Sequence, residues 1–163
     1  MISIEESARL AVSTDLDVIG ALLDHAIAEL EPRRGGSIWT RRETRARPIH
    51  DALDRALTDD DQLIVVGTID DVVVGYSGVQ RERLLDGATL AVVEDIYVLP
   101  EAREVGVGEA MLNLCLQWAE ESGCVGLDAL ALPGDRQTKN FFESFGLVAR
   151  AIIVHRDLQG GDA

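Results

Sequence analysis

One stretch of the sequence decides the fold: VEDIYVLPEAREVGVGEAML, residues 93–112. It continues a predicted β-strand, rich in Val and Ile, that runs from Thr89 to Val98 and is followed by Pro100 and a glycine-containing turn. From Gly106 to Glu121 the apolar residues recur at the spacing of one helix face, which predicts a long helix. Such a turn presents free backbone N–H groups and the positive end of the helix dipole at one point. An anion is expected to bind there.

The spacing of the glycines distinguishes this turn from other phosphate-binding motifs. A dinucleotide fingerprint, G-x-G-x-x-G, lacks its third glycine because Met111 stands at that position after Gly106 and Gly108. A Walker-type loop lacks its Gly-Lys-Ser/Thr. What remains is the pattern R-x-x-G-x-G over residues 103–108. A tight strand-to-helix turn without a ligand is the alternative interpretation.

The other elements follow from hydrophobic periodicity and turn residues. The predicted strands cover residues 9–12, 63–69, 72–79, 89–98, 125–132 and 147–154. The predicted helices cover residues 16–30, 45–57, 106–121 and 135–144, and residues 33–40 are predicted to form a loop. The fold class is therefore α/β with mixed strand directions, in the order β-α-α-β-β-β-α-β-α-β. The antiparallel meander in the middle excludes a plain doubly wound sheet.

Length and composition predict one globular domain. With 163 residues, 47% of them hydrophobic and 27% charged, residues 1–158 are expected to form a single domain, and 159–163 a disordered tail. The N-terminal residues lack the pattern of a signal peptide, and no apolar run approaches membrane-spanning length, so we expect a cytoplasmic protein without a membrane partner. Neither the two cysteines nor the three histidines show metal-ligand spacing, so no disulfide and no metal site is expected.

The net charge of −14 argues against a nucleic-acid partner, because binding to phosphates needs clustered cations. One segment is nevertheless basic. Its arginines are Arg33, Arg34, Arg41, Arg42, Arg45 and Arg47, called the arginine segment below. Either they pair with nearby acids on a solvated surface, or they form a patch for an anionic group of a substrate or partner.

Three segments, in this order, resemble the GCN5-related N-acetyltransferase superfamily. Residues 8–16 are similar to its first strand and helix start, residues 93–112 to its acetyl-CoA motif, and residues 135–147, which contain FFESFGL, to its C-terminal motif. The resemblance implies a central, mostly antiparallel mixed sheet with helices on both faces. It also implies transfer of an acetyl group from acetyl-CoA to a primary amine, by direct attack in a ternary complex and without a metal.

The resemblance implies main-chain roles for most of the cofactor site. The backbone of Ile96 to Val98 should run beside the pantetheine arm, with the Val98 N–H free to polarise the thioester carbonyl. Residues 104–109 should wrap the pyrophosphate, with Glu104 pointing to solvent. The implied cofactor-binding residues are Ile96, Tyr97, Val98, Arg103, Glu104, Val105, Gly106, Val107, Gly108, Glu109, Asp135 and Phe142. Asp135 replaces an asparagine that is common in the family.

Acyl transfer also requires a base for the amine and an acid for the leaving thiolate. Glu94 matches a family strand glutamate and is the candidate base. Asp95 should face the other side of the strand, because side chains alternate; the alternative is that both are ordinary solvent-facing acids. Phe142 stands where many members carry tyrosine, and a phenyl ring donates no proton. Water, Tyr97 or Tyr76 are then the candidate proton donors.

The acceptor is not specified by these motifs. Trp39, Arg34 and Tyr76 are the candidate substrate residues, since loops of this kind carry specificity. A carboxylate or phosphate on the acceptor would suit the arginines, whereas a polyamine would suit the acidic surface.

Two other functional classes stay open at this stage. One is a CoA-binding regulatory or interaction module that has lost catalysis. The other is a nucleotide-binding protein that uses the same turn. A homodimer formed through a strand edge or the last strand is also left open.

Overall fold

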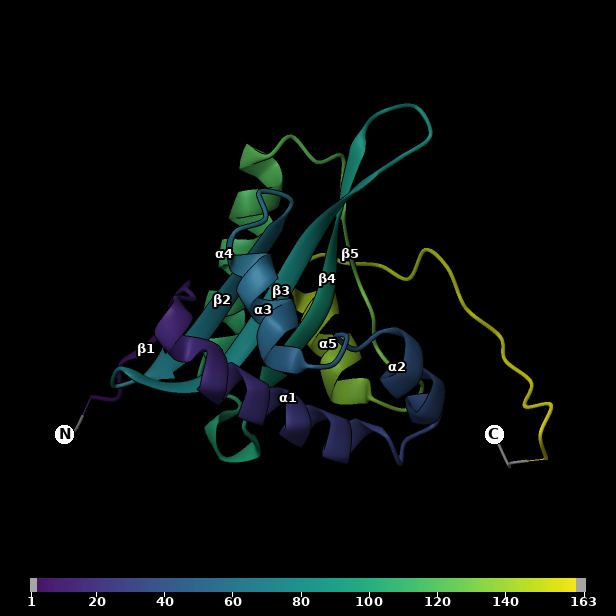
Figure 1. Cartoon of the computed structure of the whole chain (residues 1–163), viewed down its shortest axis with the longest axis horizontal. Helices are drawn as coiled ribbons and strands as arrows, with labels where there is room; N and C mark the ends of the chain where they lie inside the picture. The colour runs from purple at the N-terminus through teal and green to yellow at the C-terminus, as the bar shows by residue number, and fades with distance from the viewer. Residues whose placement is uncertain (1–2, 161–163) are drawn as a thin grey trace.

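The computed structural model describes residues 3–160 and contains one five-stranded sheet with helices on both faces (Figure 1). The strands are Glu6–Leu10 (β1), Gln62–Ile69 (β2), Val72–Arg83 (β3), Thr89–Val98 (β4) and Leu127–Ala129 (β5). The helices are Leu16–Leu30 (α1), Gly36–Arg42 (α2), Ile49–Leu57 (α3), Val107–Glu121 (α4) and Arg136–Ser144 (α5), with 3₁₀ turns at Ser13–Asp15 and Pro100–Ala102. The strand order is β1-β2-β3-β4-β5, and only β4 and β5 are parallel. The predicted α/β class and the mostly antiparallel mixed sheet are confirmed.

Two hydrophobic clusters lie on opposite faces of the sheet. Helices α1 and α3 pack on one face through residues such as Ile19 and Leu53, and α4 and α5 pack on the other through Met111 and Phe142. Strand β2 serves both clusters because its side chains alternate. Its buried valines are divided between them, Val66 on the α1 side and Val65 on the α4 side.

Helix α4 lies unusually close to the sheet at Gly67. A Cβ added to Gly67 would lie 2.4 Å from Val107 Cγ1 and 3.0 Å from Met111 Sδ. The absence of a side chain on β2 therefore lets the first turn of α4 sit against the strand. This contact fixes where the glycine turn before α4 is held.

Strands β4 and β5 separate after a short paired stretch. Residues 91–93 of β4 pair with 127–129 of β5, and β4 then continues to Val98 without β5 beside it. On its other side β4 stays paired with β3, where the Leu99 N–H donates to the Val74 carbonyl at 2.9 Å. Antiparallel hydrogen bonds alternate, so the N–H and C=O of Val98 point away from β3, into the opening between β4 and β5.

The loop predicted over residues 33–40 contains the start of helix α2, which corrects that prediction. Gly35 precedes the helix with φ of +79°, a conformation that glycine adopts without strain. Gly36 is packed so tightly that a Cβ would lie 2.1 Å from the Leu30 carbonyl oxygen. The glycine pair therefore marks a sharp change of direction between α1 and α2. The next helix, predicted from residue 45, begins at Ile49, because Pro48 is its N-cap.

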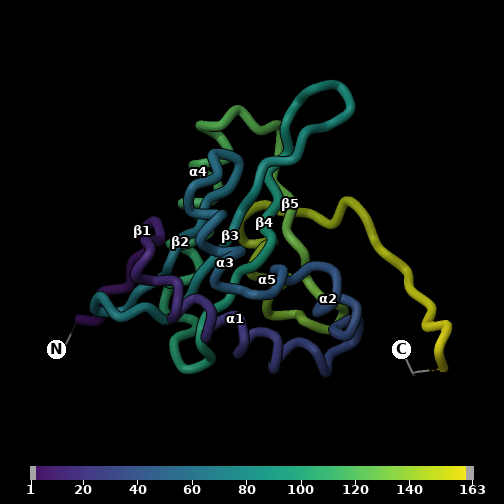
Figure 2. Tube along the Cα trace, in the orientation of Figure 1, coloured from purple at the N-terminus to yellow at the C-terminus, as the bar shows by residue number. Residues whose placement is uncertain are grey.

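The strand predicted over residues 147–154 is wrong. This segment has no regular secondary structure, and Ile152 and Val154 are 85% and 90% exposed. In Figure 2 it runs away from the body of the molecule. The strand predicted over 125–132 is reduced to β5, which is only three residues long. β-Branched residues favour a strand only where a neighbouring edge can pair with them.

Several sequence-based expectations concern the chain outside this core. The predicted tail falls partly on residues 161–163, which lie outside the described residues. Across residues 3–160, none of the helices combines the length and apolar character needed to cross a membrane. Both cysteines, Cys115 and Cys124, are free thiols.

Replacing Gly67 tests the close packing of α4. We expect Gly67→Ala to lower the free energy of unfolding by about 1–3 kcal/mol, because the new methyl group overpacks the contact with Val107. Gly20→Ala is the control, because nothing lies within 4 Å of its Cβ in α1, and it should stabilise by about 0.5–1 kcal/mol. Urea denaturation measures both; equal stability of the Gly67 variant and the unmodified chain would contradict the packing argument.

Candidate functional site

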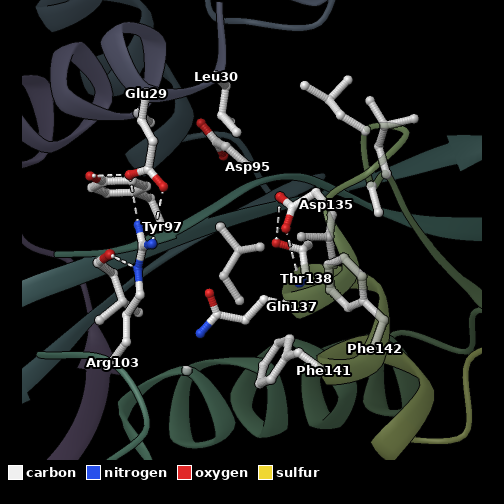
Figure 3. Close-up of a pocket in the computed structure, with 18 of the residues that line it drawn as sticks. Glu29, Leu30, Asp95, Tyr97, Arg103, Asp135, Gln137, Thr138, Phe141 and Phe142 are labelled. Atoms are coloured by element: carbon white, nitrogen blue, oxygen red, sulfur yellow. Dashed lines mark hydrogen bonds and ion pairs between the residues drawn. The ribbon is translucent and has the colours of Figure 1, made fainter. Parts of the chain in front are cut away.

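A cleft of about 470 Å³ lies where β4 and β5 separate, between the end of α1 and the starts of α4 and α5 (Figure 3). Most of the residues predicted from the sequence line it. These are Trp39, Tyr76, Glu94, Ile96, Tyr97, Val98, Arg103, Glu104, Gly106, Gly108, Glu109, Asp135 and Phe142.

Three predicted residues do not line this cleft. The Val107 side chain is buried against β2, and the Val105 side chain is exposed on the outside of the turn. Only main-chain roles had been predicted for these two. Arg34 lies in the exposed connection between α1 and α2, whereas its neighbour Arg33 lines the cleft.

The glycine turn presents unbonded main-chain amides to the cleft. Glu104 and Gly106 have φ of +66° and +98°, so the chain turns sharply before α4. The first main-chain hydrogen bond of α4 is donated by the Ala110 N–H to the Gly106 carbonyl oxygen, at 3.0 Å. The main-chain N–H groups of residues 104–109 donate no hydrogen bond to any acceptor in residues 3–160. Glu104 is exposed and is one of the residues that line the cleft, and its pointing to solvent stays a prediction.

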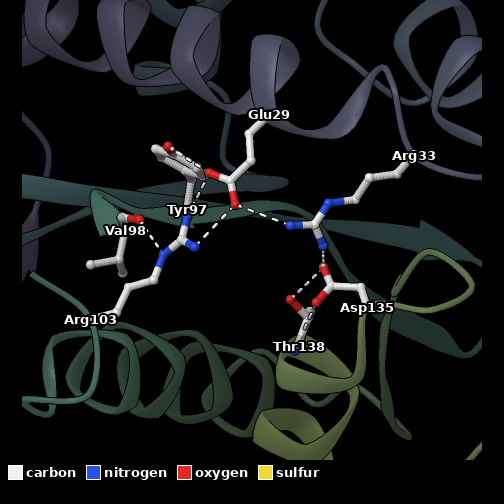
Figure 4. Close-up of polar contacts among 7 residues, drawn as sticks. All are labelled: Glu29, Arg33, Tyr97, Val98, Arg103, Asp135 and Thr138. Atoms are coloured by element: carbon white, nitrogen blue, oxygen red, sulfur yellow. Dashed lines mark hydrogen bonds and ion pairs between the residues drawn. The ribbon is translucent and has the colours of Figure 1, made fainter. Parts of the chain in front are cut away.

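Arg103 ties the turn to β4 and α1. Its Nε donates to the Val98 carbonyl oxygen at 2.9 Å, and its Nη1 and Nη2 donate to the two carboxylate oxygens of Glu29 at 3.0 and 2.8 Å (Figure 4). The hydrogen bonds from Arg103, opposed by burial, lower the pKa of Glu29. The Tyr97 hydroxyl also donates to Glu29, at 3.0 Å. Glu29 was missed in the sequence because it is one polar residue on a helix, with no motif around it.

A second arginine extends this network to the other side of the cleft. Arg33 lies 3.4 Å from Glu29 and 3.3 Å from Asp135 (Figure 4). Asp135 caps α5, since it accepts hydrogen bonds from the Thr138 N–H at 3.2 Å and the Thr138 hydroxyl at 2.8 Å. The network Arg103–Glu29–Arg33–Asp135, called the cleft network below, thus joins the end of α1 to the turn before α4 and to the N-cap of α5.

Glu94 and Asp95 both approach one guanidinium, which corrects the prediction that only one would face the cleft. The pairing of β3 with β4 shifts between Gly78 and Val79, so Glu94 is an extra residue without a partner. A β-bulge of this kind interrupts the alternation of side chains. Arg45 Nη2 lies 3.2 Å from Glu94 Oε2, and Arg45 Nε lies 3.0 Å from Asp95 Oδ2.

The Arg45 ion pairs are largely withdrawn from solvent. The Arg45 and Asp95 side chains are each 8% exposed, and Glu94 is 26% exposed. Burial raises the pKa of Glu94, and the positive charge of Arg45 opposes this rise. Glu94 therefore combines an accessible carboxylate with an increased proton affinity, as a general base requires.

The two tyrosines of the cleft hold their protons tightly. Burial, with the hydrogen bond to Glu29, raises the pKa of Tyr97 to about 12. Burial, with the charge of Asp95, raises the pKa of Tyr76 well above its usual value. The Tyr76 side chain is fully buried, and its hydroxyl has no hydrogen-bond partner in the described part of the chain.

Most of the arginine segment is engaged in ion pairs. The pairs involve Arg33, Arg42, Arg45 and Arg47, with acids on α1, on β4, in the 43–46 segment or at the start of α5. The first of the two interpretations therefore applies to Arg33, Arg42 and Arg47, whereas Arg45 pairs with its acids in a buried position that neither interpretation described. No group of three or more potential metal ligands is present in residues 3–160.

The fold and this cleft define a class: an α/β protein with a turn of unbonded main-chain amides at a helix start, beside a strand with a free main-chain N–H. The sequence matches the acetyltransferase (GNAT) family over residues 21–147. The chain belongs to this family. The fold and family implied by the resemblance are thus confirmed.

Several solved structures share the fold at low sequence identity. The aminoglycoside N-acetyltransferase AAC(6')-Iy in complex with CoA aligns with a TM-score of 0.73 and 17% identity, covering 96% of this chain and 97% of that one. The same enzyme with a bisubstrate analogue, CoA-S-monomethyl-acetylneamine, aligns with a TM-score of 0.72 and 18% identity. The alignment covers 94% of this chain and 98% of that one. A ribosomal-protein-alanine N-acetyltransferase from Brucella melitensis biovar Abortus 2308 aligns with a TM-score of 0.65 and 18% identity. The alignment covers 95% of this chain and 99% of that one. A transcriptional regulator from Bacillus halodurans C-125 aligns with a TM-score of 0.71 and 19% identity. The alignment covers 94% of this chain and 100% of that one. No curated protein matches the sequence.

Replacing Arg45 tests the buried ion pairs. Arg45→Gln leaves the charges of Glu94 and Asp95 without their counter-ion, so we expect the free energy of unfolding at pH 7 to fall by about 3 kcal/mol. The control is Arg47→Gln. Arg47 pairs with Asp24 at the surface, where both side chains are more than 60% exposed, and its loss should cost about 0–1 kcal/mol. If chemical denaturation showed similar losses of unfolding free energy for the two variants, the buried Arg45 ion pairs would not matter more to stability than the exposed Arg47 pair.

Proposed function

We propose that this protein transfers an acetyl group from acetyl-CoA to a primary amine, by direct attack within a ternary complex. The proposal rests on one observation above all: the same cleft is lined by Val98, whose main-chain N–H is free, and by four residues of the turn with unbonded amides, Glu104, Gly106, Gly108 and Glu109. Main-chain amides at a helix start suit a diphosphate. A single inward N–H on a strand suits a thioester carbonyl.

In this proposal the cleft holds CoA from the diphosphate to the thioester. The diphosphate would be held by the turn at the start of α4, and the pantetheine arm would run beside Ile96 and Val98. Phe141 and Phe142 of α5 form the apolar part of the wall on the other side. Family membership and the CoA complex of the aminoglycoside enzyme support this placement.

Glu94 begins the reaction as the base. It takes one proton from the acceptor ammonium, and the free amine attacks the thioester carbonyl carbon. The developing oxyanion accepts a hydrogen bond from the Val98 N–H. The C–S bond then breaks, and the nitrogen loses its second proton as the amide forms. The products are the acetylated amine and CoA, with one proton released overall.

The leaving thiolate receives its proton from solvent or from the attacking nitrogen. Phe142 carries no proton, and the Tyr97 proton is held by Glu29 with a pKa of about 12. An ordinary thiol has a pKa of about 8.5, so proton transfer from Tyr97 to the thiolate would be unfavourable by about 3.5 pKa units. Tyr97 instead orients Glu29, and through it Arg103.

Glu94→Gln tests the role of the base. We expect kcat at pH 7 to fall by about 10²–10⁴-fold, because the amide cannot accept the ammonium proton. The Kd for acetyl-CoA should not change. In the unmodified enzyme kcat/KM should rise with pH through the raised pKa of Glu94, since only the carboxylate is active, and this acid limb should vanish in the variant. Thiol release from acetyl-CoA with a library of amines provides the assay.

Glu120→Gln is the matched control, because Glu120 is exposed on α4 and does not line the cleft. It should leave both kcat and the pH profile unaltered. If Glu94→Gln kept full turnover across the pH range, the assignment of Glu94 as the base would be wrong.

A CoA-binding module without catalysis is the second candidate, and Phe142 favours it. The Phe142 ring is 5% exposed and packs between α5 and the sheet, where it offers no proton donor. One structural neighbour is described as a transcriptional regulator rather than an enzyme. Binding of CoA with no thiol release for any amine would favour this candidate.

Phe142→Tyr distinguishes the two candidates further. In an enzyme that protonates its thiolate through solvent, the added hydroxyl should keep or raise kcat, and the change should not abolish turnover. The comparison is made with saturating amine and acetyl-CoA. Complete loss of turnover in a folded variant would contradict solvent protonation.

A further inference from the structure

A second, polar cavity lies behind Glu94. Its volume is about 270 Å³, and it is bounded by α3, by the segment before α3, and by β2 and β3. The residues that line it are Glu43, Thr44, Arg45, Ala46, Ala52, Arg55, Gln62, Gln80 and Glu94. Glu94 is the residue of this cavity that also lines the main cleft.

The bulge at Glu94 explains why this side chain belongs to two cavities. Because Glu94 has no partner on β3, its carboxylate is displaced from the regular strand positions. It contacts Arg45, whose other contact is with Asp95 in the main cleft. The Glu94–Arg45 pair thus lies between the polar cavity and the cleft. In a ternary complex the acceptor nitrogen must reach both the base and the thioester, and Glu94 lines both the polar cavity and the cleft that would hold the cofactor.

The charges of the polar cavity limit what it can bind. Arg45 is already balanced by two carboxylates, and Glu43 pairs with Arg42 at 3.4 Å. Arg55, by contrast, has no ion pair with any of residues 3–160. The lining of the cavity therefore includes one guanidinium without an ion pair in residues 3–160, that of Arg55, and the Glu94 carboxylate.

Two amide side chains complete the lining. The Gln62 amide N–H donates to Asp59 at 2.8 Å and that of Gln80 to Glu82 at 3.4 Å, which leaves their carbonyl oxygens to accept hydrogen bonds from a ligand. Such a lining matches a small molecule with both a carboxylate and an ammonium group. The volume is below the usual range for drug-sized ligands, which favours a compact one.

We propose that the cavity lined by Arg55, Gln80 and Glu94 binds the acceptor, and that the acceptor is a small amine that also carries a carboxylate, such as an amino acid. Arg55 holds the carboxylate and Glu94 receives the ammonium proton. This inference rests on the proposed acetyl transfer. It also assigns a direction: the acceptor approaches Glu94 from the α3 side, opposite to the cofactor.

The test compares free amino acids with the same amino acids as C-terminal amides, which keep the ammonium group and lose the carboxylate. Thiol release from acetyl-CoA is followed for each pair. We expect at least one free amino acid to have kcat/KM at least about tenfold above that of its amide, and Arg55→Gln to abolish this preference while activity on the amide persists. Arg83→Gln, which removes one exposed arginine from the distant β3–β4 hairpin, should keep the preference.

Calorimetry provides a second readout that does not depend on catalysis. The free amino acid is titrated into protein saturated with CoA, and Arg55→Gln should weaken this binding about tenfold. Binding that depends on Arg55, without thiol release, would support the acceptor cavity and refute the proposed acetyl transfer. Acetyl transfer with equal preference for acids and amides, with a preference for spermidine, or with no effect of Arg55→Gln would overturn the cavity assignment and leave the transferase intact. Absence of both binding and turnover would overturn it as well.

Discussion

The whole site depends on the separation of β4 from β5 beyond Val93. A continuous parallel pair would have satisfied the main-chain groups of Val98 within the sheet. Because β5 is only three residues long, these groups face a cleft instead. The Val98 carbonyl is bonded by Arg103, and its N–H is left for a ligand. The same opening brings the amides before α4 into line with β4, so binding and chemistry share one continuous surface.

Ion pairs between charged residues hold the elements around the opening between β4 and β5 in place. Arg103 and Arg33 share Glu29, and Arg33 also reaches Asp135, so the cleft network connects α1, α4 and α5. Ion pairs that are partly buried contribute little net stability, but they fix the geometry of the groups they join. Arg45 has the corresponding role at Glu94 and Asp95. Both networks place arginines against acids from distant parts of the sequence, which accounts for much of the arginine segment.

Local patterns predicted much of the fold and the central part of the site. The strand, the glycine turn and α4 follow from periodicity and spacing within 93–121, and the structure has them where expected. Contacts between distant residues were not predictable. Glu29 meets Arg103 across 74 positions, and Arg45 meets Asp95 across 50, with no motif to connect them. The bulge at Glu94 depends on the register with β3, and the failed strand over 147–154 depends on a missing partner edge.

The central claim is that the main-chain amides of residues 104–109 hold the diphosphate of CoA. A calorimetric titration of the folded protein with CoA, and with pantetheine as the fragment that lacks the diphosphate, tests it most directly. We expect one CoA per chain, bound at least about 100-fold more tightly than pantetheine, because charge-assisted hydrogen bonds to the diphosphate supply most of the affinity. Equal affinities for the two compounds, or no binding of CoA by the folded chain, would contradict it.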